Sequence, residues 1–368
     1  MGHDAAMVVR LESLAFGGEA VGHADDGRVV LVARGAPGDR VRVRVTAEHK
    51  RWLRAEICEI VEAGADRVPP ACPHFADCGA CQWQHVGYEA QLRAKRAIVE
   101  SALRRLGVTV EGPVPAMAPF GTRRRVRLLA QDGRVGYRAW RSRRFVPVET
   151  CPVLVPALWQ AVRAAPPRGG EIVGLAGANA VGTGDDVVEL AAPAEPSLRV
   201  PADVFAQASA DGDSALAALV RDWAEAGGRR VIEIFAGAGN FTRWLIADGA
   251  DVTAIEGDAR AAEWLARNAA AAHAIRDDAA RAVLALAEAG ERFDVAVLDP
   301  PRAGCRELLP DLARLAPSRI VYVSCDPMTL GRDLERLAHL GWRTTRARCF
   351  DLVPQTSHVE TVALAVRS

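Results

Sequence analysis

The stretch Val231-Ile-Glu-Ile-Phe-Ala-Gly-Ala-Gly-Asn-Phe241 decides the fold of the C-terminal part of the chain. Its first five residues read as an apolar strand, and its glycines predict a tight turn into a helix at 241–248. Further strands are expected at 252–255, 293–298, 319–323 and 360–366, and helices at 214–226, 259–272 and 328–340. Strands that alternate with helices of this length predict an α/β fold, with a doubly wound, Rossmann-like parallel sheet covered on both faces.

Two regions precede this sheet. In residues 1–65, β-branched runs such as Val41-Arg-Val-Arg-Val45 alternate with turn residues, which predicts a small closed β-barrel of the OB-like type. Such barrels often bind oligonucleotides. Residues 66–200 predict a central α+β domain with a cysteine cluster, a helix over 88–106 and several strands. Residues 201–368 are expected to form the domain of the parallel sheet.

Charge is distributed unevenly along the 368 residues. Lys and Arg number 46, as do Asp and Glu, so the formal net charge is zero. Residues 1–160 nevertheless hold 24 basic and 17 acidic residues, and the rest of the chain holds 22 and 29. The most basic segment, 121–144, contains nine arginines and a single acid, Asp132. The asymmetry indicates a polyanionic partner contacted by the N-terminal half, and the alternative is a solvated basic strand pair.

The composition disfavours several classes of protein. No run of about 18 uncharged apolar residues occurs, which argues against a membrane span. The first residues lack a basic region followed by an apolar block, so no secretory signal is expected. A cytoplasmic location is expected, and it disfavours a disulfide framework for the eight cysteines. Nothing in the sequence indicates an obligate protein partner, and a monomer is expected.

The glycine turn after the first strand of the sheet predicts a ligand site. A ligand can approach its backbone closely, and the helix N-terminus that follows favours an anion or a carboxylate. Glu256 ends the next strand, where an acid accepts hydrogen bonds from ribose hydroxyls. Because the loop lacks the third glycine of the pyrophosphate motif, an adenosyl ligand such as S-adenosylmethionine fits better than NAD. A tight turn without a ligand is the alternative.

Further reactive side chains follow neighbouring strands of the same sheet. Asp299 and Cys325 are expected at the carboxyl ends of their strands, where ligands bind. The helix expected after Cys325 predicts a lowered pKa of its thiol and a nucleophilic thiolate, and a buried core cysteine is the alternative. Glu360 and His358, at the start of the last strand, are candidates for proton transfer, although His358 fits a structural hydrogen bond equally well.

Three motifs together resemble the RNA uracil-5-methyltransferases: Asp299-Pro-Pro-Arg-Ala-Gly304, Ser324-Cys-Asp-Pro-Met-Thr-Leu330 and Pro354-Gln-Thr-Ser-His-Val-Glu360. The glycine loop matches the cofactor loop of that family, with Ala236 where Cys is frequent. Phe205-Ala-Gln207 is similar to its Phe-x-Gln motif, and the N-terminal barrel looks like the TRAM RNA-binding domain of many members. The resemblance implies a class I methyltransferase sheet and S-adenosylmethionine-dependent synthesis of 5-methyluridine in RNA.

The resemblance also implies roles for individual residues. Cys325 matches the nucleophile that attacks C6 of uracil, and Glu360 matches the base that removes the C5 proton. The residues at positions around the cofactor and the target base are Gln207, Phe235, Asn240, Glu256, Asp278 and Asp299. Asp278 departs most from the family pattern, because the loop before it is short. The arginines of 121–144 are placed to contact phosphates, and Phe205 to stack on a base.

Cys72-x5-Cys78-x2-Cys81 and the distant Cys151 form a second constellation. Four thiolates hold tetrahedral zinc or an iron–sulfur cluster, and the spacing does not choose between them. The pattern is similar to the cluster motif of the iron–sulfur members of the family. That similarity implies a four-iron–four-sulfur (4Fe-4S) cluster on these cysteines, which either is structural or helps to shape the RNA site.

The function implied is methylation of C5 of a specific uridine, with 23S rRNA as the expected substrate and a tRNA as the alternative. An RNA cytosine-5-methyltransferase is disfavoured because Arg302, in place of a cysteine, follows Pro301. A non-catalytic RNA-binding protein is disfavoured by the presence of Cys325, Glu256 and Glu360.

Overall fold

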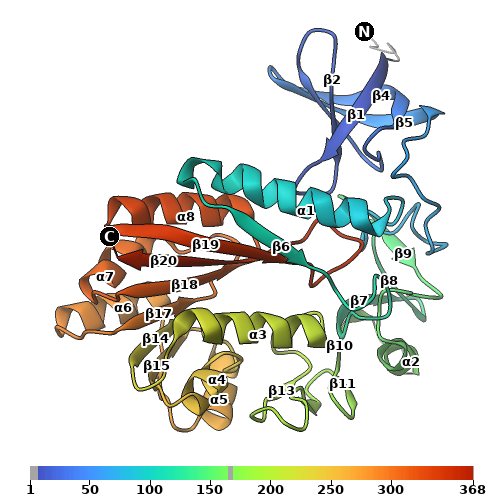
Figure 1. The fold of residues 1–368 in the computed structure, drawn as a ribbon. Helices are drawn as coiled ribbons and strands as arrows, with labels where there is room; N and C mark the ends of the chain where they lie inside the picture. The colour runs from blue at the N-terminus through green and yellow to red at the C-terminus, as the bar shows by residue number, and fades with distance from the viewer. Residues whose placement is uncertain (1–6, 165–168, 368) are drawn as a thin grey trace.

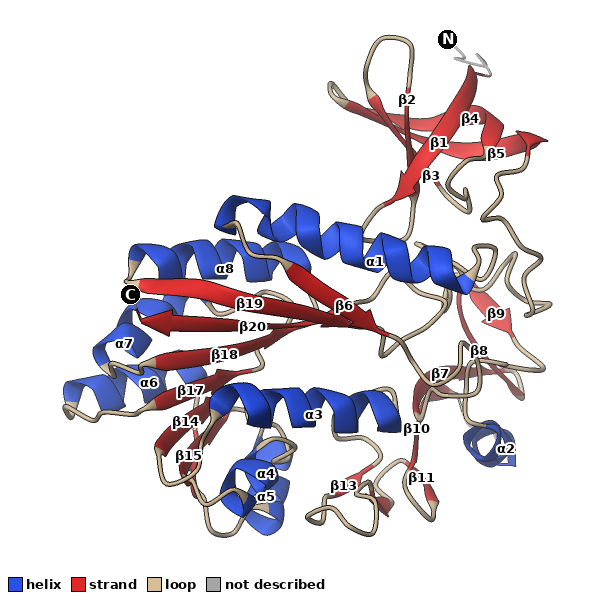
Figure 2. Ribbon diagram, viewed as in Figure 1, coloured by secondary structure: helices blue, strands red, loops and turns tan. Residues whose placement is uncertain are grey.

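The computed structural model describes residues 7–164 and 169–367. A closed barrel, a five-stranded sheet with a separate strand pair, and an eight-stranded sheet make up its β-structure. Figure 1 shows the barrel set apart from the rest of the molecule, and Figure 2 shows the eight-stranded sheet between two layers of helices. Within the described ranges, no helix has the length and apolar character needed to cross a bilayer.

The N-terminal barrel closes in the strand order β1-β2-β3-β5-β4. Its strands are β1 (Met7–Leu14), β2 (Ala20–His23), β3 (Val29–Val32), β4 (Arg40–Glu48) and β5 (Trp52–Glu62). Val41 and Val43 of β4 are buried inside, whereas Arg40, Arg42 and Arg44, which alternate with them, are exposed, as the alternation of that strand predicts. The closed barrel expected from the sequence is therefore confirmed.

The central region begins with a long helix and continues as a small sheet. Helix α1 (Tyr88–Leu103) passes into a 3-10 turn at Arg104–Leu106 and ends at Gly107, whose φ of 65° is left-handed. The sheet has the order β11-β10-β7-β8-β9 and lies near helix α2, and strands β12 and β13 pair separately. Their bounds are β7 (Arg125–Gln131), β8 (Arg134–Arg138), β9 (Phe145–Pro147), α2 (Pro156–Ala164), β10 (Gly170–Ala176), β11 (Val181–Thr183), β12 (Val187–Glu189) and β13 (Arg199–Pro201).

The C-terminal sheet has the order β16-β15-β14-β17-β18-β20-β19-β6. Its strands are β14 (Arg230–Ile234), β15 (Asp251–Glu256), β16 (His273–Arg276), β17 (Val295–Leu298), β18 (Arg319–Ser324), β19 (Trp342–Phe350), β20 (Glu360–Arg367) and β6 (Val110–Val114). Its helices are α3 (Ala210–Ala224), α4 (Thr242–Ala247), α5 (Ala259–Asn268), α6 (Ala279–Glu288), α7 (Leu309–Arg314) and α8 (Pro327–His339), with a 3-10 turn at Arg306–Leu308. Strands β14 to β18 are parallel, and β20 is antiparallel to its neighbours. The α/β sheet predicted from the sequence is confirmed.

Two apolar layers hold this sheet between its helices. One layer joins the sheet to α1, α6, α7 and α8, through buried residues such as Leu103 and Leu334. The other joins it to α3, α4 and α5, through residues such as Trp223 and Leu265. Helices on both faces bury every central strand, which explains why those strands are apolar throughout.

One strand reaches this sheet from far away in the sequence. Strand β6 pairs in parallel with β19, so that Val110 lies opposite Ala347. Helix α1 directly before it packs against α8. A segment inside the range expected for the central domain therefore forms one edge of the C-terminal sheet and part of its helical layer (Figure 1).

Candidate active site

A cavity of about 870 Å³ lies at the carboxyl ends of the central parallel strands. Seven of the eight residues that the sequence singled out for catalysis or cofactor binding line it: Gln207, Phe235, Asn240, Glu256, Asp299, Cys325 and Glu360. Asp278 is not among the lining residues. Its side chain begins helix α6 by accepting a hydrogen bond from the backbone N–H of Arg281 (3.1 Å).

The glycine loop forms one wall of this cavity. Phe235 follows β14 with a φ of 67°, a conformation that is costly for a residue with a Cβ atom and that is found mostly at functional sites. Glu256 accepts hydrogen bonds from the backbone N–H groups of Gly237 (2.8 Å) and Asp258 (2.7 Å). The bond from Gly237 ties the loop after β14 to the end of β15, and the bond from Asp258 is local to the turn after β15. Together they fix the Glu256 carboxylate at the cavity wall.

Asp213 is a cavity residue that the sequence reasoning missed. It accepts hydrogen bonds from Asn240 Nδ2 (2.6 Å) and from the Arg124 guanidinium (2.8 Å). The Arg124–Asp213 ion pair is almost completely buried, so it rigidly joins the central sheet to the cofactor loop. The sequence signal was Ser209, whose side chain accepts a hydrogen bond from Gly212 N and starts helix α3 at Ala210. The sequence-based helix began four residues too late, at Ser214.

Cys325 lies between the end of β18 and the start of α8, as expected, but its thiol is not acidified. Burial and the Glu360 and Asp299 carboxylates raise the pKa of Cys325 to about 11, and the opposing effect of the Arg302 guanidinium is smaller. The lowered pKa predicted from the neighbouring helix N-terminus is therefore wrong. Desolvation and two nearby acids outweigh the helix dipole.

The two carboxylic acids of the site also have shifted pKa values. Burial raises the pKa of Glu360 to about 7, while Arg302 and Lys95 oppose this shift. Burial, and then the negative charge of Glu360, raise the pKa of Asp299 well above its ordinary value. Two acids in one low-dielectric site therefore remain protonated at a pH where surface carboxylates are ionised. Perturbed pairs of this kind are typical of sites that transfer protons.

His358 contacts Arg302 but does not line the cavity, and it is not a strong base. The guanidinium of Arg302 approaches both ring nitrogens of His358, at 3.2 and 3.3 Å. Burial and the Arg302 charge lower the pKa of His358 to about 4, so its ring is neutral at neutral pH. It is therefore placed to accept a hydrogen bond from Arg302, which lines the cavity beside Cys325.

Three further arginines and an exposed aromatic ring are among the residues that line the cavity. Arg125, Arg127 and Arg260 line it. Phe205 is 64% exposed, and the guanidinium carbon of Arg125 lies 5.6 Å from the centre of its ring. Large apolar side chains are seldom this exposed. The Phe205 ring is suited to stack on a base, and the arginines beside it are suited to contact its phosphate.

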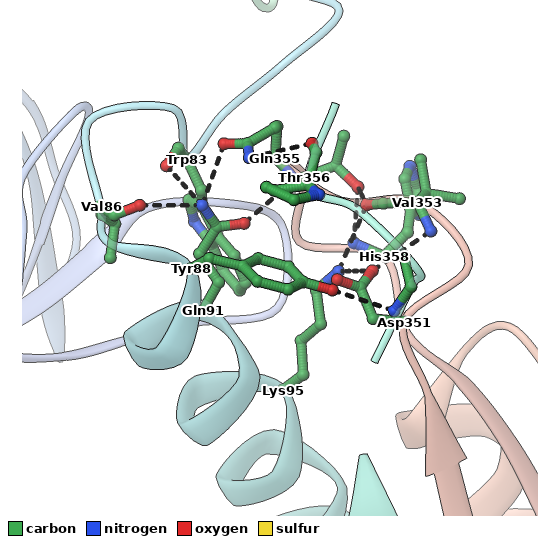
Figure 3. Close-up of polar contacts among 12 residues, drawn as sticks. Trp83, Val86, Tyr88, Gln91, Lys95, Asp351, Val353, Gln355, Thr356 and His358 are labelled. Carbon is green, nitrogen blue, oxygen red and sulfur yellow. Dashed lines mark hydrogen bonds and ion pairs between the residues drawn. The ribbon is translucent and has the colours of Figure 1, made fainter. Parts of the chain in front are cut away.

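A network of buried polar contacts fixes the segment that leads into Glu360 (Figure 3). The Lys95 ammonium lies 2.5 Å from Asp351 Oδ1 and donates to the Val353 carbonyl (3.2 Å). Gln91 Nε2 donates to Gln355 Oε1 (3.0 Å), and the Gln355 carbonyl accepts hydrogen bonds from the N–H groups of Gln82 and Trp83. Helix α1 and the loop after the cysteines thus hold residues 351–355 in place.

The four predicted metal ligands share a second, small cavity. Cys72, Cys78, Cys81 and Cys151 line it together with apolar side chains, and the Tyr137 hydroxyl lies 3.6 Å from the Cys151 sulfur. Thiolates in a water-poor setting suit zinc or an iron–sulfur cluster. In residues 7–164 and 169–367, however, no group of three or more His, Cys, Asp or Glu is arranged to hold a metal ion. The cysteines are thus brought together, but not into the geometry of a single-ion site.

Comparison with known families gives two matches. The family model described as tRNA (Uracil-5-)-methyltransferase matches residues 191–368, and the TRAM domain model matches residues 6–58. These two ranges contain the eight-stranded sheet except β6, and most of the barrel.

Two relatives are similar over nearly the whole chain. The 23S rRNA (uracil(1939)-C(5))-methyltransferase RlmD of Halomonas elongata is 32% identical over 96% of this chain and 88% of its own length. The protein of the same description from Pseudomonas fluorescens is 31% identical over 96% of this chain and 92% of its own length.

A solved structure shares the fold. The tRNA (uracil-54, C5)-methyltransferase of Pyrococcus abyssi, in complex with S-adenosyl-L-homocysteine, superposes with a TM-score of 0.76. It is 24% identical and covers 98% of this chain and 100% of that chain.

Proposed function

This chain belongs to the RNA (uracil-5-)methyltransferase family, and we propose that it methylates C5 of one specific uridine in 23S rRNA. The observation that carries the proposal is the meeting of Cys325, Glu360 and Asp299 in one cavity with the glycine loop and Glu256. The choice of 23S rRNA over tRNA is supported by the two relatives named as 23S rRNA enzymes, which match both the barrel and the sheet.

The proposed reaction begins with covalent activation of the uracil ring. C5 of uracil is a weak nucleophile. The Cys325 thiol releases its proton to solvent, and bonding of the Sγ thiolate to C6 places electron density on C5. S-adenosylmethionine, when bound, would supply an electrophilic methyl group that C5 takes up, with the neutral thioether S-adenosylhomocysteine as the leaving group. Glu360 then removes the C5 proton, the C6–S bond breaks, and the thiolate of Cys325 is regenerated.

The shifted pKa values suit these roles. Because Glu360 has a pKa near 7, it is partly ionised at neutral pH and can still hold the proton that it removes. Burial raises the pKa of Asp299 well above its ordinary value, and in its protonated form Asp299 is able to donate a hydrogen bond to a uracil carbonyl oxygen that gains negative charge in the adduct. The charge of the Arg302 guanidinium lowers the pKa of the Cys325 thiol and so favours the thiolate that attacks the substrate.

For the cofactor, we assign the glycine-loop wall. Glu256 would accept hydrogen bonds from the ribose hydroxyls, and Phe235 and Asn240 would border the same ligand. Gln207 lies across the cavity, with its backbone carbonyl fixed by Arg124 (3.0 Å), and is assigned to the cofactor or the target base. The cofactor role of Asp278 stays a prediction, because Asp278 caps α6 and does not line the cavity.

The reaction is tested with labelled S-adenosylmethionine and RNA from a strain that lacks the gene. After digestion, 5-methyluridine in 23S rRNA is expected. Label in tRNA alone would replace the rRNA proposal with the tRNA alternative, and 5-methylcytidine or no product would refute uracil methylation.

Two variants test the residue roles. Cys325→Ala should abolish turnover, and normal turnover would refute the covalent mechanism. Glu360→Gln should retain attack on C6 but not removal of the C5 proton, so it should accumulate a covalent protein–RNA adduct that resists denaturation. Glu288→Gln, which changes an exposed acid at the end of α6 that does not line the cavity, is the matched control and should methylate RNA at nearly the wild-type rate.

We also propose that Cys72, Cys78, Cys81 and Cys151 hold a four-iron–four-sulfur cluster. In support, all four line one cavity with an apolar wall, and thiolates are the ligands such clusters use. Each cluster thiolate binds its own iron atom, so the four sulfurs need not converge on one point, unlike the ligands of zinc. Anaerobic purification followed by iron and sulfide analysis tests this proposal, and one equivalent of zinc without iron would refute it.

The remaining expectations also stand as proposals: barrel, central and sheet domains divided near residues 65 and 200, a cytoplasmic location, and a monomer that needs no protein partner. Light scattering coupled to size-exclusion chromatography tests the monomer.

A further inference from the structure

A third hollow, separate from the reaction cavity and the cysteine cavity, lies in the surface around the turn between β8 and β9. Its volume is about 540 Å³, and residues 137–143, together with Gly79 and Ala80 of the loop between two cysteines, line it. None of these residues lines the reaction cavity. In Figure 1, β8 and β9 lie below the barrel, on the side where the N-terminal end of α1 is found.

The walls of this hollow are held in place from two sides. On the barrel side, Arg141 pairs with the buried carboxylate of Glu19 (2.9 Å), which also pairs with Arg54. On the other side, Gly79 N donates to the Arg138 carbonyl (3.0 Å), and a Cβ atom on Gly79 would lie only 2.6 Å from Trp140 N. The turn is thus clamped between the barrel and the cysteine loop, so the shape of the hollow is built into the fold.

The side chains of the hollow that do not hold the turn in place are of the types that bind nucleic acid. Arg138 and Arg143 are exposed and have no ion-pair partner in the parts of the chain that the structure describes. This distinguishes them from other arginines of the basic segment, such as Arg144, which pairs with Asp77, and Arg127, which pairs with Glu171. Between the two unpaired arginines, Trp140 lines the hollow, and the guanidinium carbon of Arg141 lies 5.3 Å from the centre of its ring.

We propose that this hollow is a second RNA-binding site, which holds an unpaired segment of the RNA substrate away from the target uridine. One base stacks on Trp140, and the phosphates on either side pair with Arg138 and Arg143. An unpaired segment is favoured over a duplex because only an unstacked base offers its face to an indole. The proposal rests on the RNA substrate of the proposed function.

The test measures RNA binding and turnover with the full chain. Fluorescence anisotropy gives the Kd of a labelled single-stranded oligouridylate of about 12 nucleotides, with a duplex of equal length as the second probe. Arg138→Gln/Arg143→Gln should raise the single-strand Kd on the order of 10- to 30-fold at 0.1 M salt and reduce the salt slope by about 1.4. In turnover, it should raise the KM for RNA and leave kcat unchanged at saturating RNA.

Two further variants separate stacking and charge from general damage. Trp140→Ala should raise the Kd about tenfold, and Trp140→Phe should restore most of the loss because phenylalanine still stacks. The control is Arg104→Gln/Arg105→Gln, which removes the same charge at the far, C-terminal end of α1. It should change the Kd by no more than about twofold. Helix α1 has 16 residues and is therefore about 24 Å long, which separates this end by more than a Debye length from the helix start on the side of the hollow.

The outcomes separate the two proposals. If the wild type methylates RNA but Arg138→Gln/Arg143→Gln has the Kd and KM of the wild type, the hollow is not an RNA site and the inference is overturned. Equal loss of duplex and single-strand binding would overturn the unpaired-segment assignment. If the wild type methylates no RNA, the proposed function itself fails.

Discussion

Removal of the charge of Asp351 should destabilise the protein in a pH-dependent way. The Lys95 ammonium and the Asp351 carboxylate are both completely buried and lie 2.5 Å apart. Asp351→Asn keeps the shape of the side chain but leaves Lys95 without a counter-charge. Loss of one partner of a buried ion pair typically costs about 3–5 kcal/mol of unfolding free energy.

The pH dependence arises because Lys95 avoids being a buried unpaired charge when it loses its proton. Burial lowers the pKa of Lys95, and the Asp351 charge opposes that shift in the wild type. In the variant, the native chain loses the Lys95 proton, whereas the unfolded chain retains it. Releasing a proton from an ordinary lysine costs about 4.6 kcal/mol at pH 7 and about 2 kcal/mol at pH 9. Because the unfolded state binds more protons, the stability of the variant recovers as the pH rises.

Urea unfolding followed by circular dichroism measures this effect at several pH values. Lys95→Met/Asp351→Leu should recover much of the loss, because apolar side chains of similar size replace the pair. Glu100→Gln, which removes an exposed carboxylate from the same helix, is the control and should change little. A loss for Asp351→Asn below about 1 kcal/mol, or one that does not depend on pH, would refute the reasoning.

Three other predictions address the site and the helices around it. The value of kcat at saturating RNA should rise with pH up to about 7, because Glu360 acts as a base only when ionised; a flat profile between pH 5 and 8 would exclude it as the limiting base. Burial raises the pKa of Glu233 to about 8, so the wild type loses stability as the pH rises from about 4.5 to 8. Glu233→Gln should remove that loss and unfold at higher urea than the wild type above pH 8 but not below pH 4.5, and equal midpoints would contradict the assigned shift. Ser209→Ala should cost about 1 kcal/mol of unfolding free energy through loss of the α3 cap, Ser209→Asp should retain most of it, and equal losses would argue against capping.

Local patterns in the sequence predicted most of the C-terminal sheet and the contents of the reaction cavity. The alternation of apolar strands and helices sufficed for β14, β15, β17 and β18, because parallel strands buried on both faces are rich in apolar residues. Strand β16 was not predicted, because His273–Arg276 lies at the edge of the sheet and is largely exposed. The family resemblance is confirmed by relatives of more than 30% identity over nearly the whole chain. The motifs placed Cys325, Asp299 and Glu360 on one rim, and the structure brings them to one cavity.

What escaped prediction depends on contacts between distant residues. Strand β6 joins the sheet only through β19, and no local pattern announces that pairing. The thiol pKa of Cys325 depends on burial and on Glu360, 35 positions further along the chain, so a rule based on the neighbouring helix failed. Asp213 enters the cavity because Arg124 and Asn240 hold it there, and both partners come from other elements.

The position of β6 has a consequence for synthesis of the protein on the ribosome. Arg348 of β19 binds Glu111 of β6 across 237 positions of sequence, so this edge of the sheet forms only when nearly the whole chain has been translated. The barrel, whose strands all lie within Met7–Glu62, is able to fold as soon as it emerges. Helix α1 and β6 are synthesised long before β19, so their apolar surface stays exposed until β19 has been translated. Chaperone binding to nascent chains is therefore expected to concentrate on this interval, and a circular permutant that begins near β19 would shorten it.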